Sequence, residues 1–205
     1  MTVRGASNRQ SRSPLKDVYV ARTVEEPQPV IESFLNGLGR ALGHTATIYT
    51  IGSTHLTFLE SRGLQPHFER DGYGPSDISD FKDELQRHLE GKFPKEDRTV
   101  VLNSRRPLRW IGYRKLAFNI VPTVHLTAVR ASVEEFLGNE FGVVPRMQSF
   151  RPHITIGEVH YDIDNTVPQN PARLLPGGLQ IPRNVAMNGL SVYLGSIHPE
   201  PSAVA

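Results

Sequence analysis

The chain of 205 residues contains no cysteine and only one tryptophan, and it has no long run of apolar residues. Without cysteine it cannot form disulfides, use a thiol nucleophile or bind a metal through thiolates, which fits a reducing compartment. The apolar runs are far shorter than the roughly 18–20 residues that a membrane-spanning helix needs. The amino terminus also lacks the apolar core of a signal peptide. We therefore expect a cytoplasmic protein that does not associate with membranes.

The composition is that of an ordinary globular domain. Hydrophobic residues make up 38% and charged residues 21% of the chain, and a chain of this length can bury a core without metals or disulfides. The first 15 residues carry three arginines and no acid, so we expect a disordered basic arm over 1–15. A single domain over 16–197 and a flexible tail over 198–205 should follow. The net charge of +2 is compatible with a polyanionic ligand.

Alternating apolar and polar residues predict strands, and apolar residues at helical spacing predict helices. Helices are expected over 30–42, 78–89 and 123–140, with Ser76 as the cap of the second helix and Gly91 as its end. Strands are expected over 16–24, 45–61, 98–103, 110–121, 149–159 and 185–196. Loops rich in glycine, proline and asparagine are expected over 62–75 and 162–184.

Two segments of the chain can be superposed. Val20 and Phe118, each in a predicted strand, precede His55 and His153 by the same 35 residues. A shift of 98 residues also carries apolar positions of the first helix onto those of the third: Ile31 onto Val129, Leu35 onto Val133 and Leu38 onto Phe136. The chain is therefore predicted to contain two copies of strand, helix and strand, each ending in His-apolar-Thr-apolar.

The two His-x-Thr motifs are the strongest functional signal. Successive side chains of a strand point to opposite faces, so His55 shares a face with Thr57, and His153 shares a face with Thr155. In two copies related by an approximate twofold axis, these pairs would face each other across a cleft. One imidazole can then accept a proton while the other donates one, as a phosphodiester exchange requires. The two threonine hydroxyls are placed to bind phosphate oxygens without a metal.

A third copy of the same letters provides an internal comparison. His125, Leu126 and Thr127 begin the apolar stripe of the third helix, so His125 is interpreted as a helix-entry residue and not as a catalyst. The remaining histidines show no spacing typical of metal ligands and are expected to be solvated.

The motifs "HLTF" (55–58) and "RPHITI" (151–156) resemble the paired signatures of the 2H phosphoesterases, in the branch of RNA 2′,5′-ligases and 2′,3′-cyclic phosphodiesterases. The resemblance covers residues 17–196. It implies an α+β fold of two lobes related by a pseudo-twofold axis, in which two antiparallel sheets face each other across a central cleft and the helices lie outside. It also implies a site made of His55, Thr57, His153 and Thr155, with no cofactor. In the ligase-like branch a basic residue often follows the second motif, whereas this chain has Glu158.

The expected activity is metal-independent hydrolysis of 2′,3′-cyclic phosphates on RNA ends or nucleotides, in this family usually to the 2′-phosphate. The alternatives are hydrolysis of another cyclic phosphodiester, such as a cyclic oligonucleotide or an ADP-ribose cyclic phosphate, and a non-catalytic module that binds RNA or phosphate. A monomer is expected, and the nearly symmetric pair does not reveal which histidine is the base. The candidates for further substrate contacts are Arg151, Arg109 and Tyr49. The basic segment of Arg105, Arg106, Arg109, Arg114 and Lys115 either guides an RNA strand or forms a solvated turn.

Overall fold

The computed structural model describes residues 17–25, 29–43, 46–50, 54–60, 64–93, 98–142, 150–161, 168–175, 177 and 179–195. The predicted arm and tail lie outside these residues. The elements, in chain order, are β1 (Val18–Val24), α1 (Pro29–Leu42), β2 (Ala46–Thr50), β3 (His55–Glu60), α2 (Gln65–Arg70), α3 (Pro75–Lys92), β4 (Thr99–Val101), β5 (Leu108–Ile111), β6 (Lys115–Asn119), α4 (Val124–Phe141), β7 (His153–Tyr161), a 3₁₀ turn η2 (Pro171–Leu174) and β8 (Asn184–Leu194). The fold is α+β. None of the helices in the described ranges is long and apolar enough to cross a bilayer.

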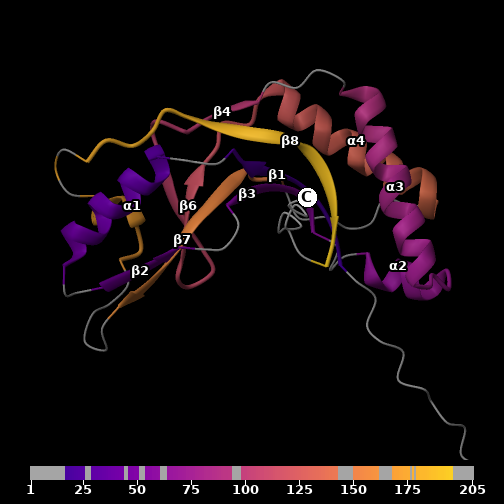
Figure 1. Cartoon of the computed structure of the whole chain (residues 1–205), viewed down its shortest axis with the longest axis horizontal. Coiled ribbons are helices and arrows are strands. Elements are labelled where there is room, and N and C mark those ends of the chain that lie inside the picture. The colour runs from indigo at the N-terminus through magenta and orange to yellow at the C-terminus, as the bar shows by residue number, and fades with distance from the viewer. Residues whose placement is uncertain are drawn as a thin grey trace, which may run out of the picture.

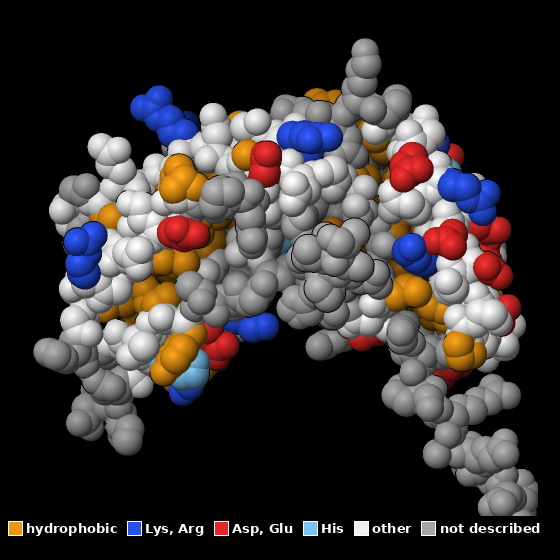
Figure 2. Space-filling model, viewed as in Figure 1, with side chains coloured by type: hydrophobic (Ala, Val, Ile, Leu, Met, Phe, Trp, Pro, Cys, Tyr) orange, Lys and Arg blue, Asp and Glu red, His pale blue; other side chains and the backbone are white. Residues whose placement is uncertain are grey.

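All strand pairs are antiparallel, and the strands follow one hydrogen-bonded path in the order β4-β8-β1-β3-β7-β6-β5, with β2 added beside β7. Two separate sheets were expected, and the described residues instead form one sheet of eight strands. Its two halves meet where β3 pairs with β7 through Leu56 and Ile154, the registered pair that joins them among the described residues. The molecule is arched, with β8 along its crown (Figure 1), and the space-filling view shows a concave lower edge between the two halves (Figure 2).

The helices cross from one half of the sheet to the other. Although α1 follows β1, it packs on the half that contains β2, β6 and β7, where the ring of Phe34 lies 5.2 Å from that of Phe118. Although α4 follows β6, it packs on β3, where Arg130 donates a hydrogen bond to the carbonyl of Phe58. Figure 1 shows α1 on one flank and α3 and α4 on the other. The predicted copies of strand, helix and strand therefore exchange their helices.

The exchanged helices bury equivalent positions. The shift of 98 residues relates three pairs of residues that are buried in both helices: Ile31 and Val129, Phe34 and Ser132, and Leu35 and Val133. The same core cluster includes Leu56, Phe118 and Ile154 of the sheet, each 0% exposed. One apolar cluster runs through both halves, so the helices cover one face of the sheet and leave the other face for polar side chains.

Several element boundaries differ from those predicted. Helix α3 is capped at Gly74, whose N–H donates to the carboxylate of Asp77 at 2.6 Å, and not at Ser76. It begins with Pro75, which suits the first helical turn because its missing N–H has no partner there, and it continues past Gly91 to Lys92. The predicted strand over 110–121 is part of a hairpin of β5 and β6 that turns at Gly112, where φ is 63°.

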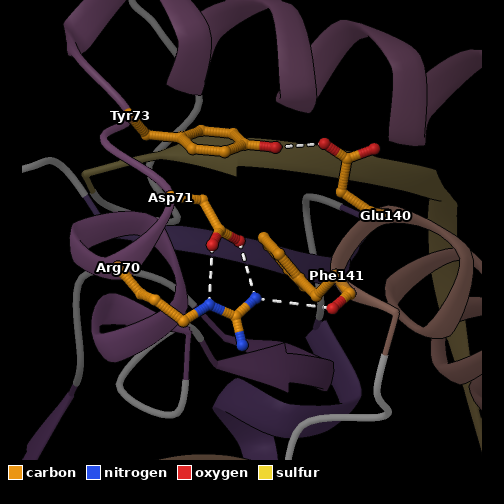
Figure 3. Close-up of polar contacts among 5 residues, drawn as sticks. All are labelled: Arg70, Asp71, Tyr73, Glu140 and Phe141. Carbon is orange, nitrogen blue, oxygen red and sulfur yellow. Dashed lines mark hydrogen bonds and ion pairs between the residues drawn. The ribbon is translucent and has the colours of Figure 1, made fainter.

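A short helix, α2, lies within the predicted loop over 62–75 and is tied to the end of α4 (Figure 3). Arg70 binds Asp71 through two bonds of 2.6 and 2.7 Å and donates to the carbonyl of Phe141 at 3.4 Å. Tyr73 donates its hydroxyl hydrogen to Glu140. Burial raises the pKa of Tyr73, and the bond to Glu140 raises it further, so this hydroxyl remains a donor at neutral pH.

Candidate functional site

The two His-x-Thr motifs lie on neighbouring antiparallel strands at the junction of the two halves. Leu56 and Ile154 pair directly, and both are 0% exposed on the helix side. Extending this register by one residue sets His55 opposite Thr155 and Thr57 opposite His153. These four side chains are half-buried and point away from the helices. We call this side of the sheet the motif face.

The register gives the motif residues a crossed arrangement. His55 and His153 are diagonal neighbours, and so are Thr57 and Thr155. Diagonal neighbours in an antiparallel pair are about 7–8 Å apart, with their Cβ atoms somewhat closer. That separation leaves room for one phosphate group between two imidazole rings, with a threonine hydroxyl from each strand beside it.

The strands outside the motifs repeat the same pattern. Ala21 lies opposite Thr57, and Ala117 lies opposite Thr155. Thr23 lies opposite His55, and Asn119 lies opposite His153. Each motif threonine thus has a small neighbour, and each motif histidine has a polar one.

This register corrects part of the predicted superposition. Val20 was matched with Phe118 by the shift of 98 residues that matches the motifs. The equivalent residues of β1 and β6 are instead Ala21 and Ala117, because each lies opposite a motif threonine. The outer strands are therefore related by a shift of 96 residues.

A β-bulge follows each motif threonine. The register skips Phe58 in β3 and Ile156 in β7, and both residues are buried. A bulge reverses the faces to which the following residues point. In β7 the next residues, Gly157 and Val159, are buried, so Glu158 lies on the motif face.

Glu158, the residue that departs from the ligase-like pattern, belongs to a polar cluster on this face. It lies opposite Tyr49 of β2 and Lys115 of β6. Its carboxylate lies 3.0 Å from Nε2 of His160. The ring of His160 packs edge-on against Tyr49 at 4.9 Å, and its Nδ1 lies 3.2 Å from a guanidinium nitrogen of Arg114. His160 is therefore held by neighbours and is not simply solvated as predicted.

Gly157 sets the position of this cluster because a larger residue does not fit. A Cβ atom there would lie 3.0 Å from the carbonyl oxygen of Tyr49 and 3.2 Å from a methyl carbon of Ile48. We expect Gly157→Ala to lower the free energy of unfolding by about 1–3 kcal/mol, because backbone must move. Gly39→Ala in α1 is the matched control, since no described atom outside the helix's own backbone lies within 4 Å of its Cβ position. Helix propensity predicts a gain of up to about 1 kcal/mol there. Urea unfolding of both variants tests this, and a loss in both would contradict it.

The surroundings of His153 define its tautomer. Its Nδ1 lies 2.9 Å from the carbonyl oxygen of Arg151, which can only accept a hydrogen bond. Nδ1 therefore carries the hydrogen in the neutral ring, and Nε2 keeps its lone pair. Burial lowers the pKa of His153 from its ordinary value of 6.5, and the Arg109 guanidinium lowers it further. The bond to the Arg151 carbonyl opposes this lowering. His153 is therefore mainly neutral at neutral pH and can accept a proton at Nε2.

The three candidate substrate contacts occupy different places. Arg109 pairs with Ala117, which pairs with Thr155, so Arg109 lies on the motif face two strands from the second motif. Arg151 is exposed and lies just before β7. The ring of Tyr49, 55% exposed, lies beside His160 on the motif face.

Two further residues of the motif face, Thr23 and Asn119, were not predicted as part of the site. Thr23 accepts a hydrogen bond from Asn188 at 2.9 Å, and Asn119 donates to the carbonyls of Arg106 and Leu108 at 2.7 and 3.3 Å. These two residues can be recognised only from the register, because each lies opposite a motif histidine. The alternation of residues within a single strand does not define the register between strands. The third His-x-Thr copy lies in a helix as predicted: His125 is in the first turn of α4, with its ring 5.5 Å from that of Phe93.

Within the described ranges, no three histidine or acidic side chains are grouped so that they could hold a metal ion. Comparison with known proteins gives no assignment: no protein-family model matches the chain, and no curated protein matches it significantly.

Proposed function

We propose that this protein is a metal-independent phosphodiesterase of the 2H type, which opens 2′,3′-cyclic phosphates on RNA ends or nucleotides. One observation carries the proposal: Leu56 pairs with Ile154, which brings two His-x-Thr motifs from distant parts of the chain together on one face. The matched bulges, alanines and polar neighbours of the two motifs support a pseudo-twofold arrangement. The two halves of the sheet correspond in this account to the two lobes that the family resemblance implies.

The geometry suggests separate roles for the two histidines. His153 is the general base, because its Nδ1 hydrogen is held by the Arg151 carbonyl and its pKa is lowered mainly by burial. Its Nε2 takes a proton from water as the water oxygen attacks phosphorus. The bond from phosphorus to the ribose 3′-oxygen breaks, and the imidazolium of His55 gives its proton to that oxygen. The product is a 2′-phosphomonoester.

The groups around the histidines stabilise the charge that develops on phosphorus. Thr57 and Thr155, each opposite an alanine in the sheet, donate hydrogen bonds to the two non-bridging oxygens. Hydrogen-bond donors already in position are most effective where charge builds up in the transition state. Arg109 adds positive charge on the same face, near enough to His153 to influence its pKa.

Hydrolysis of nucleoside 2′,3′-cyclic phosphates in the presence of EDTA tests the proposal. We expect turnover that EDTA does not reduce, with the 2′-phosphate as the product on chromatography. A wild-type protein that hydrolyses neither these compounds nor RNA with a cyclic phosphate end would reject the activity. Turnover that requires an added metal ion would reject the mechanism.

The pH dependence tests the assignment of His153 as the base. Because its folded-state pKa is lowered, the base form is retained as the pH falls to 6.5, and kcat/KM should decline only at lower pH. Arg109→Gln removes a cation that disfavours protonated His153, so the acidic decline should move to higher pH. Arg40→Gln, an exposed change in α1, is the control and should leave the profile unchanged. An acidic decline centred above 6.5 in the wild type would contradict the assignment.

A further inference from the structure

A pocket of about 760 Å³ is lined by two direct neighbours of His153: Pro152, which precedes it in the chain, and Asn119, which lies opposite it in the sheet. Four arginines line it: Arg105, Arg106, Arg109 and Arg151. We call it the arginine pocket. Its wall also includes Trp110, Phe150 and the amide side chains of Asn119, Gln169 and Asn170, and none of the described residues that line it is acidic. Sites for small organic ligands have volumes of about 300–1,000 Å³, so the pocket has the size for a nucleotide and exceeds what a single phosphate group needs.

The four guanidinium groups have no acidic partner among the residues that the structure describes. The ion pairs of the described side chains involve other arginines and lysines, such as Arg70, Lys92 and Arg130. Cations gathered around one hollow repel one another unless an anion occupies it. Arginine forms paired hydrogen bonds with phosphate oxygens, so the chemistry of the pocket favours phosphate groups.

The arginines of the turn before β5 are held in place by two asparagines. Oδ1 of Asn103 accepts hydrogen bonds from the backbone N–H groups of Arg105 and Arg106, at 3.0 and 3.2 Å. Asn119 donates to the carbonyl of Arg106 at 2.7 Å. The turn is thus fixed by the same residue that lies opposite His153 in the sheet. The part of a substrate bound in the pocket would therefore be held in a fixed position relative to a phosphate at His153.

The half of the molecule that contains α2, α3 and α4 carries the opposite charge to the arginine pocket. Acidic side chains gather on the flank formed by α2, α3 and α4 (Figure 2). They surround a second hollow: Asp71, Asp77, Asp80, Glu84 and Glu140. A polyanion whose end lies between the motifs is therefore directed away from this flank and toward the arginine pocket.

We propose that the arginine pocket binds the phosphodiester backbone of an RNA strand whose cyclic phosphate end lies between the motifs. This inference rests on the proposed function and narrows it: the substrate is an oligonucleotide end and not a free nucleotide. The aromatic and amide side chains of the pocket contact the sugar and base of the neighbouring nucleotide, since aromatic rings and amides bind unpaired RNA bases.

The test compares a cyclic mononucleotide with a dinucleotide that ends in a 2′,3′-cyclic phosphate. Wild-type kcat/KM should be at least about tenfold higher for the dinucleotide, since one well-formed hydrogen bond to phosphate contributes that much. The triple variant Arg105→Gln, Arg106→Gln, Arg151→Gln should bring the ratio of the two values close to one. The control triple variant Arg40→Gln, Arg87→Gln, Arg98→Gln removes the same charge at exposed sites elsewhere and should keep the wild-type ratio.

Equal kcat/KM values in the wild type, or an unchanged ratio in the pocket variant, would overturn the inference and leave the proposed function standing. If the wild type hydrolyses neither substrate, the proposed function fails and binding decides the inference. Fluorescence anisotropy with a labelled 3′-phosphorylated RNA hexamer, over a range of KCl concentrations, provides that measurement. Weaker RNA binding and a shallower salt dependence in the pocket variant alone would support RNA binding by the arginine pocket. The slope of log K against log salt concentration should be smaller by about 0.7 for each phosphate that the variant no longer neutralises. Identical binding by both triple variants would overturn it.

Discussion

Replacement of either motif histidine by alanine should lower kcat for cyclic phosphate hydrolysis by about 10²–10⁴-fold, the usual contribution of a positioned acid or base. His153→Asn refines the test. An asparagine amide can still donate to the carbonyl of Arg151, which accepts from Nδ1 of His153 at 2.9 Å, but it cannot accept a proton. His153→Asn should therefore keep the thermal stability of the wild type better than His153→Ala does and be equally inactive. Steady-state kinetics and thermal denaturation measure the two effects.

The third His-x-Thr copy supplies the control. His125 and Thr127 repeat the letters of the first motif but lie at the start of α4, outside the motif face. His125→Ala should leave kcat and KM unchanged. A His55→Ala or His153→Ala protein that is folded and keeps the wild-type rate would contradict the proposed chemistry. Loss of activity in His125→Ala without loss of fold would also contradict it.

Thr57→Val and Thr155→Val should each lower kcat/KM by about 10²-fold. Valine has nearly the shape of threonine, so the change removes a hydroxyl donor and little else. Loss of one donor that stabilises an oxyanion typically costs about 10²–10³ in rate. Serine keeps the hydroxyl, so Thr57→Ser and Thr155→Ser should retain most of the activity. Kinetics with a cyclic mononucleotide show the effect without any contribution from the arginine pocket.

Thr127→Val is the matched control for the threonines. The hydroxyl of Thr127 donates to the carbonyl of Thr123 within α4 at 3.0 Å, and its loss should leave the rate unchanged. If the serine variants were as slow as the valine variants, the hydroxyl groups would not be the groups that matter, and the threonines would have a packing role.

Features that depend on neighbours in the chain could be predicted from the sequence. The apolar spacing that predicts a helix over 123–140 corresponds to α4, whose cap Thr123 accepts from the N–H of Leu126 at 3.2 Å. The alternation in each motif predicts that His and Thr share one face, and the four residues are half-buried there. Periodicity within one element is enough for both.

Features that depend on distant parts of the chain could not be predicted. The bulges at Phe58 and Ile156 arise from pairing with β1 and β6, and without them alternation would place Glu158 in the core. The arginine pocket joins Arg105, in a turn before β5, to Arg151, just before β7. The exchange of α1 and α4 between the halves likewise depends on packing against strands from the other copy. A single sequence contains no direct record of these long-range pairings.

The bulge in β7 also determines on which face of the sheet the side chain of residue 158 lies. A basic residue at this position would lie on the motif face, where it could meet phosphate. Here Glu158 lies beside His160, with Lys115 opposite it and Arg114 against His160. A second group of cations, the four arginines of the arginine pocket, lies near the other end of β7. The basic residue of the ligase-like pattern is therefore replaced here by an acid, and under our proposal the arginine pocket binds the RNA backbone instead.

The central claim is that both motifs act on one phosphate. Single-turnover hydrolysis of a 2′,3′-cyclic phosphate by His55→Ala, by His153→Ala and by the double variant tests it most directly. Groups that act as one unit are strongly non-additive, so the account predicts that the double variant is no more than a few times slower than the slower single variant. If the two histidines acted independently, the rate of the double variant would fall by the product of the two single-variant decreases. Multiplied losses in variants that fold like the wild type, or a single variant with an undiminished rate, would contradict the account.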